Sequence, residues 1–204
     1  MKVYKFGGGV IQDPKSIRKL AQLIQTESGP LVVVVSALGK TTQALEAVLR
    51  CQVAGRPYTS QLQALHQFYQ DIVDELLDGS REAAYEVLAT WQEELLDALA
   101  LPITDAAFDK AYSCVVAQGE LLTSKLIDYY LQEQKMACTW LDARDYVKTS
   151  SGFCNAQVDW VATQRLVQKN FLPPLEQGSV ILTQGFIGSD AADETTTLGK
   201  EGSD

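Results

Sequence analysis

The apolar residues of the chain fall into short runs, separated by polar and glycine-rich segments, that predict alternating strands and helices. Residues 31–35 form an unbroken run, Leu-Val-Val-Val-Val, which is typical of a parallel strand buried on both faces at the centre of a sheet. Apolar residues at helical spacing, such as Ile17, Leu20 and Ile24, predict amphipathic helices. Strands are predicted over residues 2–6, 31–35, 136–141 and 179–187. Helices are predicted to begin at Pro14 and after Thr42, and residues 58–101 are predicted to form an antiparallel helical pair that is broken at Gly79-Ser80. Further helices are predicted over 105–118, with Asp105 as the candidate N-cap, and from Gly119-Glu120 onward. The last predicted helix covers 158–167, and Pro173-Pro174 ends that unit.

The start of the first helix is marked by two local signals. Asp13 is a preferred N-cap because its carboxylate accepts hydrogen bonds from unpaired amides of the first turn. Pro14 suits the first helical position, where its missing amide hydrogen leaves nothing unpaired. Strands that alternate with helices in this way predict an α/β sandwich with a mainly parallel sheet. The polar residues 194–204 are predicted to form a loop.

Composition and charge exclude several classes of function. The chain has 204 residues, of which 46% are hydrophobic, and a net charge of -9, whereas a general nucleic-acid or anionic-membrane binder requires a basic surface. Four scattered cysteines without a CxxC pair, together with a single histidine, argue against a zinc site and favour reduced, packed thiols. No apolar run is long enough to cross a bilayer, and the sequence begins without a signal peptide. We therefore expect a soluble, cytoplasmic protein without a bound metal.

A glycine loop follows the first predicted strand. Gly7, Gly8 and Gly9 lie between that strand and the first helix, and this order is a recognised phosphate-binding arrangement. Glycines allow the backbone to approach an anion closely, and amides near the start of a helix point at it. Lys5 would add a positive charge at the same place. The alternative is a tight turn beside a solvated lysine.

A second loop, rich in hydroxyl groups, follows the predicted central strand. Its Gly39-Lys40-Thr41 segment is similar to a Walker A loop, but that motif also requires a glycine at position 34, where the chain has Val34. A Walker loop is therefore rejected. What remains is a polar loop at the end of a strand, which is where ligands bind in open α/β sheets.

The predicted helices contain one further candidate residue. Glu120 is placed at the start of a helix, where the helix dipole favours a carboxylate. Its two candidate roles are to cap this helix and to bind the ammonium group of a ligand. His66 is predicted to be an exposed helix residue with no catalytic role. Tyr69 and Trp91 belong to apolar stripes of the helical pair, which we interpret as core or interface.

Separated motifs together resemble the aspartate kinases, a family within the amino-acid kinase fold. The motifs appear in that family's order: Lys5-Phe6-Gly7-Gly8, Val33-Val34-Val35-Ser36-Ala37 with Gly39-Lys40-Thr41-Thr42, Gly119-Glu120, Asp142-Ala143-Arg144, Gln184-Gly185-Phe186-Ile187, and residues 195–204. The resemblance implies a three-layer α/β/α sandwich. It also implies transfer of the γ-phosphoryl group of ATP, with Mg²⁺, to the side-chain carboxylate of L-aspartate, the first step of lysine, threonine and methionine biosynthesis.

The resemblance also assigns roles to residues of this chain. Lys5 would neutralise the transferred phosphoryl group, with Asp204 orienting the lysine. The remaining assignments are Gly7, Gly8 and Gly9 for phosphate binding, and Ser36, Thr42, Glu120, Lys200 and Ser203 for substrate binding, with Glu120 on the aspartate ammonium and Lys200 facing a carboxylate.

Two positions depart from the family pattern. Gly9-Val10 stands where the family has hydroxyl residues, and Lys200 stands where the family has arginine. The lysine loses the bidentate geometry that arginine has on a carboxylate.

The resemblance further implies that residues 1–204 are the amino-acid-binding part of an incomplete catalytic domain, without its carboxy-terminal nucleotide-binding part and ACT regulatory domains. A homodimer is compatible with the family. The alternatives are a related kinase for carbamate, acetylglutamate or a nucleoside monophosphate, and a non-catalytic binding module.

Overall fold

A four-stranded parallel sheet forms the centre of the molecule. The computed structural model describes residues 1–100, 103–104 and 107–199. The strands lie in the order β1-β2-β4-β3, so β2 and β4 are central. Val33 of β2 is aligned with Tyr4 on one side and with Leu182 on the other. The central, parallel position predicted for residues 31–35 is confirmed. The strands are β1 (Lys2–Phe6), β2 (Leu31–Val35), β3 (Cys138–Trp140) and β4 (Val180–Gln184).

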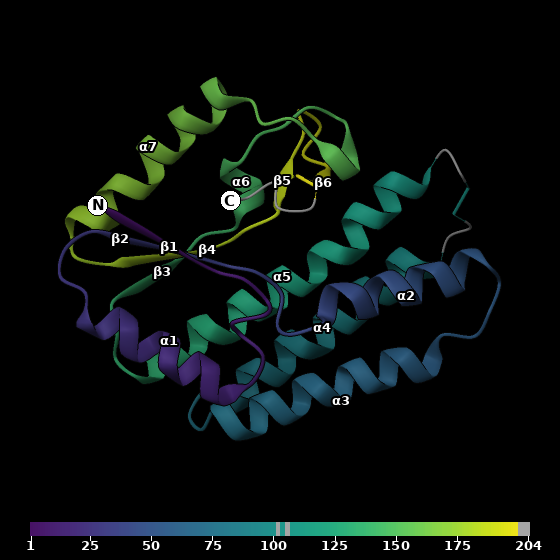
Figure 1. The fold of residues 1–204 in the computed structure, drawn as a ribbon, viewed down its shortest axis with the longest axis horizontal. Coiled ribbons are helices and arrows are strands. Elements are labelled where there is room, and N and C mark those ends of the chain that lie inside the picture. The colour runs from purple at the N-terminus through teal and green to yellow at the C-terminus, as the bar shows by residue number, and fades with distance from the viewer. Residues whose placement is uncertain (101–102, 105–106, 200–204) are drawn as a thin grey trace.

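Helices cover both faces of this sheet, which gives the three layers that the sequence predicts (Figure 1). One face packs on a large core that contains Val33, Val35 and apolar residues of five helices. The other face, with Val32 and Ile181, packs against α7, and Tyr146 of α6 joins this smaller cluster. The helices of the large core are α1 (Pro14–Thr26), α2 (Thr41–Val53), α3 (Thr59–Leu76), α4 (Arg81–Ala100) and α5 (Phe108–Glu133), and the others are α6 (Ala143–Tyr146), a 3₁₀ helix (Phe153–Asn155) and α7 (Trp160–Glu176).

The predicted start of α1 is confirmed. The Asp13 carboxylate accepts the Ser16 amide hydrogen at 2.7 Å, and the Ser16 hydroxyl accepts the Asp13 amide hydrogen at 3.0 Å. These reciprocal bonds satisfy amides that the first turn would otherwise leave unpaired. The apolar face of α1 is buried beneath the sheet.

The predicted helical pair is also confirmed, as α3 and α4. Together with α2 and α5 they form a bundle at one side of the sheet (Figure 1). His66 is half-buried in α3 rather than exposed as predicted. None of the described helices is both long and apolar enough to span a bilayer.

The prediction of two helices on either side of Gly119 is wrong. One continuous helix, α5, runs through Gly119 and Glu120, and Asp105 lies outside the described residues. Glycine in a helix costs about 1 kcal/mol relative to alanine, a cost that tertiary packing readily offsets. Here the glycine lies against α2 and the loop before it, and a side chain would not fit.

The prediction that Pro173-Pro174 ends the last helix is wrong as well. Both prolines lie inside α7, which continues to Glu176. Phe171 and Leu175, on either side of the prolines, pack against Val32 and Ile181 of the sheet. We infer that this packing holds the helix in place where proline removes two of its backbone hydrogen bonds.

The predicted strand 179–187 is divided in the structure. β4 ends at Gln184, and Phe186 has a positive φ of 69°, which turns the chain out of the sheet. β5 (Ile187–Ser189) then pairs antiparallel with β6 (Thr195–Thr197) in a second, two-stranded sheet. The start of the predicted loop 194–204 is therefore a strand.

Candidate active site

The loops that follow β1 and β2 touch at the carboxyl edge of the sheet. The Gly7 carbonyl accepts hydrogen bonds from the amides of Val10 at 2.8 Å and Ile11 at 3.1 Å, so the glycine loop is a tight turn. A Cβ atom on Gly8 would lie 2.6 Å from the Ala37 carbonyl oxygen and 2.9 Å from that of Gly39. Only glycine permits this approach, which brings the backbones of the two loops into contact.

Two backbone hydrogen bonds fix the loops to each other. The Ser36 amide donates to the Phe6 carbonyl at 3.0 Å, and the Gly39 amide donates to the Ile11 carbonyl at 2.9 Å. Ser36 is half-buried beside the end of β1, and Thr42 is half-buried in the first turn of α2. The structure thus brings Gly7, Gly8 and Ser36 together, as the sequence predicts, and leaves Gly9 exposed at the rim.

Lys5 lies on the other face of the sheet from the bundle. Tyr4 and Phe6 point into the large core, so the alternation of the strand directs Lys5 to the face that carries Val34. Its side chain is exposed, and the glycine loop begins two residues later. Lys5 and the α5 residue Glu120 therefore approach the strand ends from opposite faces.

Glu120 is the chemically unusual residue of this edge. It is 2% exposed, and its Oε1 accepts a hydrogen bond from the Ala37 amide at 3.3 Å. Its other oxygen, Oε2, is buried without a hydrogen-bond partner among the described residues. Burial raises the pKa of this carboxyl group to about 8, against the opposing effect of the Ala37 amide.

Helix capping does not explain why a carboxylate lies at position 120. The residue lies in the middle of the 26-residue helix α5, remote from the positive end of the helix dipole. A buried carboxylate oxygen without a donor is costly unless a ligand supplies one. An ammonium group is such a donor, and its positive charge would lower the pKa of Glu120 again.

Gly119 sets how closely α5 approaches the second loop. A Cβ atom there would lie 2.9 Å from both the Ala37 Cβ and the Thr41 Cγ2 atoms. We expect Gly119→Ala to destabilise the protein by about 1–3 kcal/mol through overpacking, because both neighbours belong to buried residues. Thermal unfolding would measure the loss. Gly79→Ala is the control, since the new methyl group would meet only the Glu133 side chain at 3.7 Å; equal effects of the two substitutions would contradict this packing argument.

The ends of β3 and β4 are held by side-chain bridges. The Gln184 side chain accepts the Ala143 amide hydrogen at 2.7 Å and donates to the Ser124 hydroxyl at 2.6 Å. The Asp142 carboxylate caps α6 and accepts two N–H groups of the Arg144 guanidinium, at 2.7 and 3.1 Å. These contacts fix the same edge of the sheet and satisfy the polar groups internally.

Three of the predicted site residues, Lys200, Ser203 and Asp204, lie outside the described residues. Conversely, the structure adds Tyr69 and Thr123, whose hydroxyl groups are bonded to each other and to the second loop. In the sequence Tyr69 belongs to an apolar helical stripe, and Thr123 is not among the predicted site residues. Within the described ranges, no group of three or more His, Cys, Asp or Glu side chains could hold a metal ion.

The fold and the site together define an α/β domain with a glycine turn, a hydroxyl-rich loop and a buried carboxylate at one edge of a parallel sheet. A sequence model of the amino acid kinase family matches residues 1–204, and the chain belongs to that family. It is 32% identical to lysine-sensitive aspartokinase 3 of Escherichia coli over 99% of its own length and 44% of the relative. It is 30% identical to a bifunctional aspartokinase/homoserine dehydrogenase of the same organism, covering 25% of that protein.

Solved structures give the same result. Escherichia coli aspartokinase III in complex with lysine and aspartate superposes with a TM-score of 0.86 at 29% identity, covering 98% of this chain and 44% of that one. The same enzyme with aspartate and ADP superposes with a TM-score of 0.84 at 30% identity. These matches confirm the predicted amino-acid kinase fold. The chain spans less than half the length of these relatives.

Proposed function

We propose that this chain is the amino-acid-binding part of an aspartate kinase. The observation that carries the proposal is the buried Glu120, next to the loop that the glycine turn contacts, whose Oε2 atom has no donor among the described residues. A carboxylate in this position would select a substrate with an ammonium group over a plain dicarboxylate. The relatives support the proposal, since one of their structures holds aspartate and ADP.

The proposed reaction joins two anions. An oxygen of the aspartate side-chain carboxylate attacks the γ-phosphorus of ATP, the bond from that phosphorus to the bridging oxygen breaks, and 4-phospho-L-aspartate and ADP leave. Phosphoryl transfer of this kind depends mainly on positioning and charge neutralisation. Lys5 and the amides of the glycine loop would surround the phosphoryl group, while Ser36, Thr42 and Glu120 would hold the amino acid.

The described residues do not form a carboxylate cluster for Mg²⁺. Mg²⁺ would enter with ATP, bound to its phosphates, and no step here depends on it. We further propose that the enzyme is cytoplasmic, forms homodimers and serves lysine, threonine and methionine biosynthesis, as the family resemblance implies. Lys200, Ser203 and Asp204 would complete the site.

A direct test is to trap the acyl phosphate. The purified chain would be incubated with MgATP, L-aspartate and hydroxylamine, and the coloured hydroxamate measured. We expect hydroxamate that depends on L-aspartate, and release of ADP, measured in parallel, with L-aspartate but not with N-acetylglutamate, carbamate or a nucleoside monophosphate as acceptor. Calorimetric titration with L-aspartate would run in parallel, with succinate, which lacks the ammonium group, as the control ligand. A folded chain that binds aspartate no better than succinate, or that prefers another acceptor, would overturn the proposal.

A further inference from the structure

A tyrosine in the helical bundle is bonded to the substrate loop, residues 36–42, through buried hydroxyl groups. We propose that Tyr69 is a positioning residue for aspartate binding, acting through a closed ring of hydrogen bonds with Thr41, Thr123 and the backbone of Leu38. The inference rests on the proposed function, because it concerns the loop that would hold the amino acid.

The ring is formed by four residues from three elements. The Leu38 amide donates to Thr123 Oγ1 at 3.0 Å, and Thr41 Oγ1 donates to the Leu38 carbonyl at 2.7 Å. The Tyr69 hydroxyl lies 3.1 Å from Thr41 Oγ1 and 3.1 Å from Thr123 Oγ1. All four side chains are at most 2% exposed.

The positions of the protons follow from the partners. Thr41 uses its one hydroxyl proton on the Leu38 carbonyl, so it must accept from Tyr69. Tyr69 then has no second proton, so it accepts from Thr123, which in turn accepts from the Leu38 amide. Each hydroxyl group therefore donates once and accepts once. Burial raises the pKa of Tyr69 to about 12, so its hydroxyl group keeps its proton at neutral pH.

The ring connects the loop to Glu120. Thr123 follows Glu120 by three residues on α5, nearly one helical turn, and Leu38 follows Ala37, whose amide donates to Glu120. The two consecutive amides are thus bound to two side chains of one helix face. Any shift of the Leu38 backbone would also move the Ala37 amide relative to the carboxylate that would receive the substrate ammonium.

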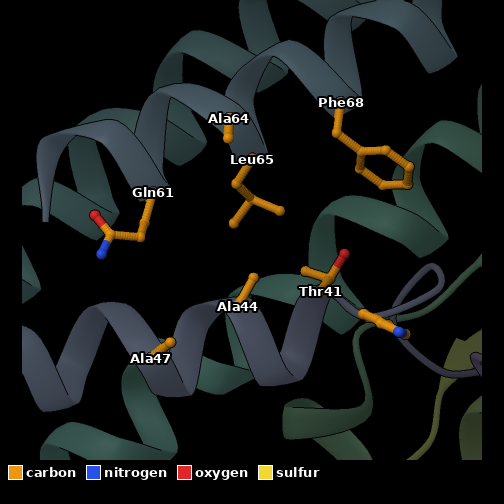
Figure 2. A pocket seen from close by; sticks show the side chains of 8 residues that line it. Thr41, Ala44, Ala47, Gln61, Ala64, Leu65 and Phe68 are labelled. Carbon is orange, nitrogen blue, oxygen red and sulfur yellow. The ribbon is translucent and has the colours of Figure 1, made fainter.

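Apolar packing also connects α3 with α2, since Leu65 of α3 and Leu45 of α2 lie in the same core. A groove of about 340 Å³ lies between α2 and α3, lined by Ala44, Ala47, Ala64 and Leu65 among others, and it reaches Thr41 of the ring. Figure 2 shows Thr41 at the end of this groove, at the start of α2, with Phe68 of α3 above it. Tyr69, the residue after Phe68, adds a buried polar contact to the loop at this end of the groove.

Removal of a single oxygen atom tests the proposal. Tyr69→Phe keeps the buried ring system but leaves Thr41 without a donor and Thr123 without an acceptor. In the ¹⁵N-labelled chain, we expect hydrogen exchange of the Ala37 and Leu38 amides to accelerate at least tenfold, and the Kd for L-aspartate to rise about tenfold. Thr123→Val should give the same two changes, and the double variant should be little worse than either single variant, because one ring is broken in each case.

Tyr112→Phe is the matched control. Tyr112 is a half-buried tyrosine of α5 whose hydroxyl group donates to Glu46 at 2.6 Å, so the variant also loses one hydrogen bond. It should leave exchange at Leu38 and the aspartate Kd unchanged. If Tyr69→Phe lowers the melting temperature but changes neither exchange nor affinity, the hydroxyl group is structural and the proposal is overturned.

The two proposals can fail separately. If the unmodified chain does not bind aspartate, the proposed function fails, and with it the role of the ring in aspartate binding. The exchange measurement still shows whether Tyr69 holds the loop. If aspartate binds normally and Tyr69→Phe leaves its Kd unchanged, only the positioning role of Tyr69 is rejected.

Discussion

Replacing Glu120 with glutamine is expected to abolish aspartate binding and, in the same protein, to raise stability at alkaline pH. The substitution keeps the shape of the side chain and the oxygen that accepts the Ala37 amide hydrogen, but it removes the negative charge. Without that charge the substrate ammonium would be buried without a counter-ion, a loss of several kcal/mol. We expect the aspartate Kd to rise at least 100-fold by calorimetry.

The effect on stability follows from the raised pKa of Glu120. In the unfolded chain the carboxyl group ionises near its ordinary value of 4.5, whereas in the folded chain it keeps its proton up to about pH 8. Between these two values the folded state binds more protons than the unfolded state, so stability falls as the pH rises. The loss reaches roughly 1.4 kcal/mol for each unit of difference between the two pKa values. Glu120→Gln removes this contribution.

Thermal or urea unfolding at pH 5, 7 and 9 would measure the difference. The variant should resemble the parent at pH 5 and exceed it in stability at pH 9. Glu93→Gln, at an exposed position of α4, is the control and should change neither the pH profile nor aspartate binding. A Glu120→Gln protein that still binds aspartate normally would show that the ammonium is held elsewhere.

The second large effect is expected at Lys5. Lys5→Met retains most of the aliphatic side chain and removes the charge that would neutralise the transferred phosphoryl group. Loss of one group that stabilises a transition state lowers kcat by about 10² to 10³, so hydroxamate formation should fall by at least that factor. The Kd for aspartate should change little, since Lys5 lies on the face of the sheet opposite α5.

The matched control is Lys15→Met, which removes an exposed lysine of α1. It should leave hydroxamate formation unchanged. Equal loss in the two variants would show that net charge, rather than the place of Lys5 beside the glycine loop, matters for the reaction. Unchanged turnover in Lys5→Met would remove Lys5 from the catalytic assignment.

Those parts of the fold that depend on local signals could be predicted from the sequence. The Asp13-Pro14 helix start and the buried strand 31–35 each combine residues whose preferences agree with the final structure. The predictions failed where packing outweighed local preference. Gly119 and Pro173-Pro174 are helix breakers in isolation, but both lie inside helices held by the sheet or by α2.

The candidate site shows the same division. Glycines after a strand and hydroxyl groups after the next strand are contiguous motifs, so the sequence places them at one edge. The burial of Glu120 could not be predicted, nor could the raised pKa that follows from it, because the burial depends on contacts with Ala37, far away in the chain. The role of Tyr69 could not be predicted for the same reason, because the hydrogen-bond partners of its hydroxyl group, Thr41 and Thr123, lie far away in the chain.

The strand order has a consequence for the folding of the chain during its synthesis on the ribosome. β2 pairs with β1 near the start of the chain, but its other partner, β4, follows only after all five helices of the large core have been made. Until Val180–Gln184 leaves the exit tunnel, one side of β2 is an unpaired strand edge rich in β-branched residues, and such an edge is prone to associate with other nascent chains. The Val35 carbonyl at the end of β2 also gains its partner only then, from the Gly185 amide.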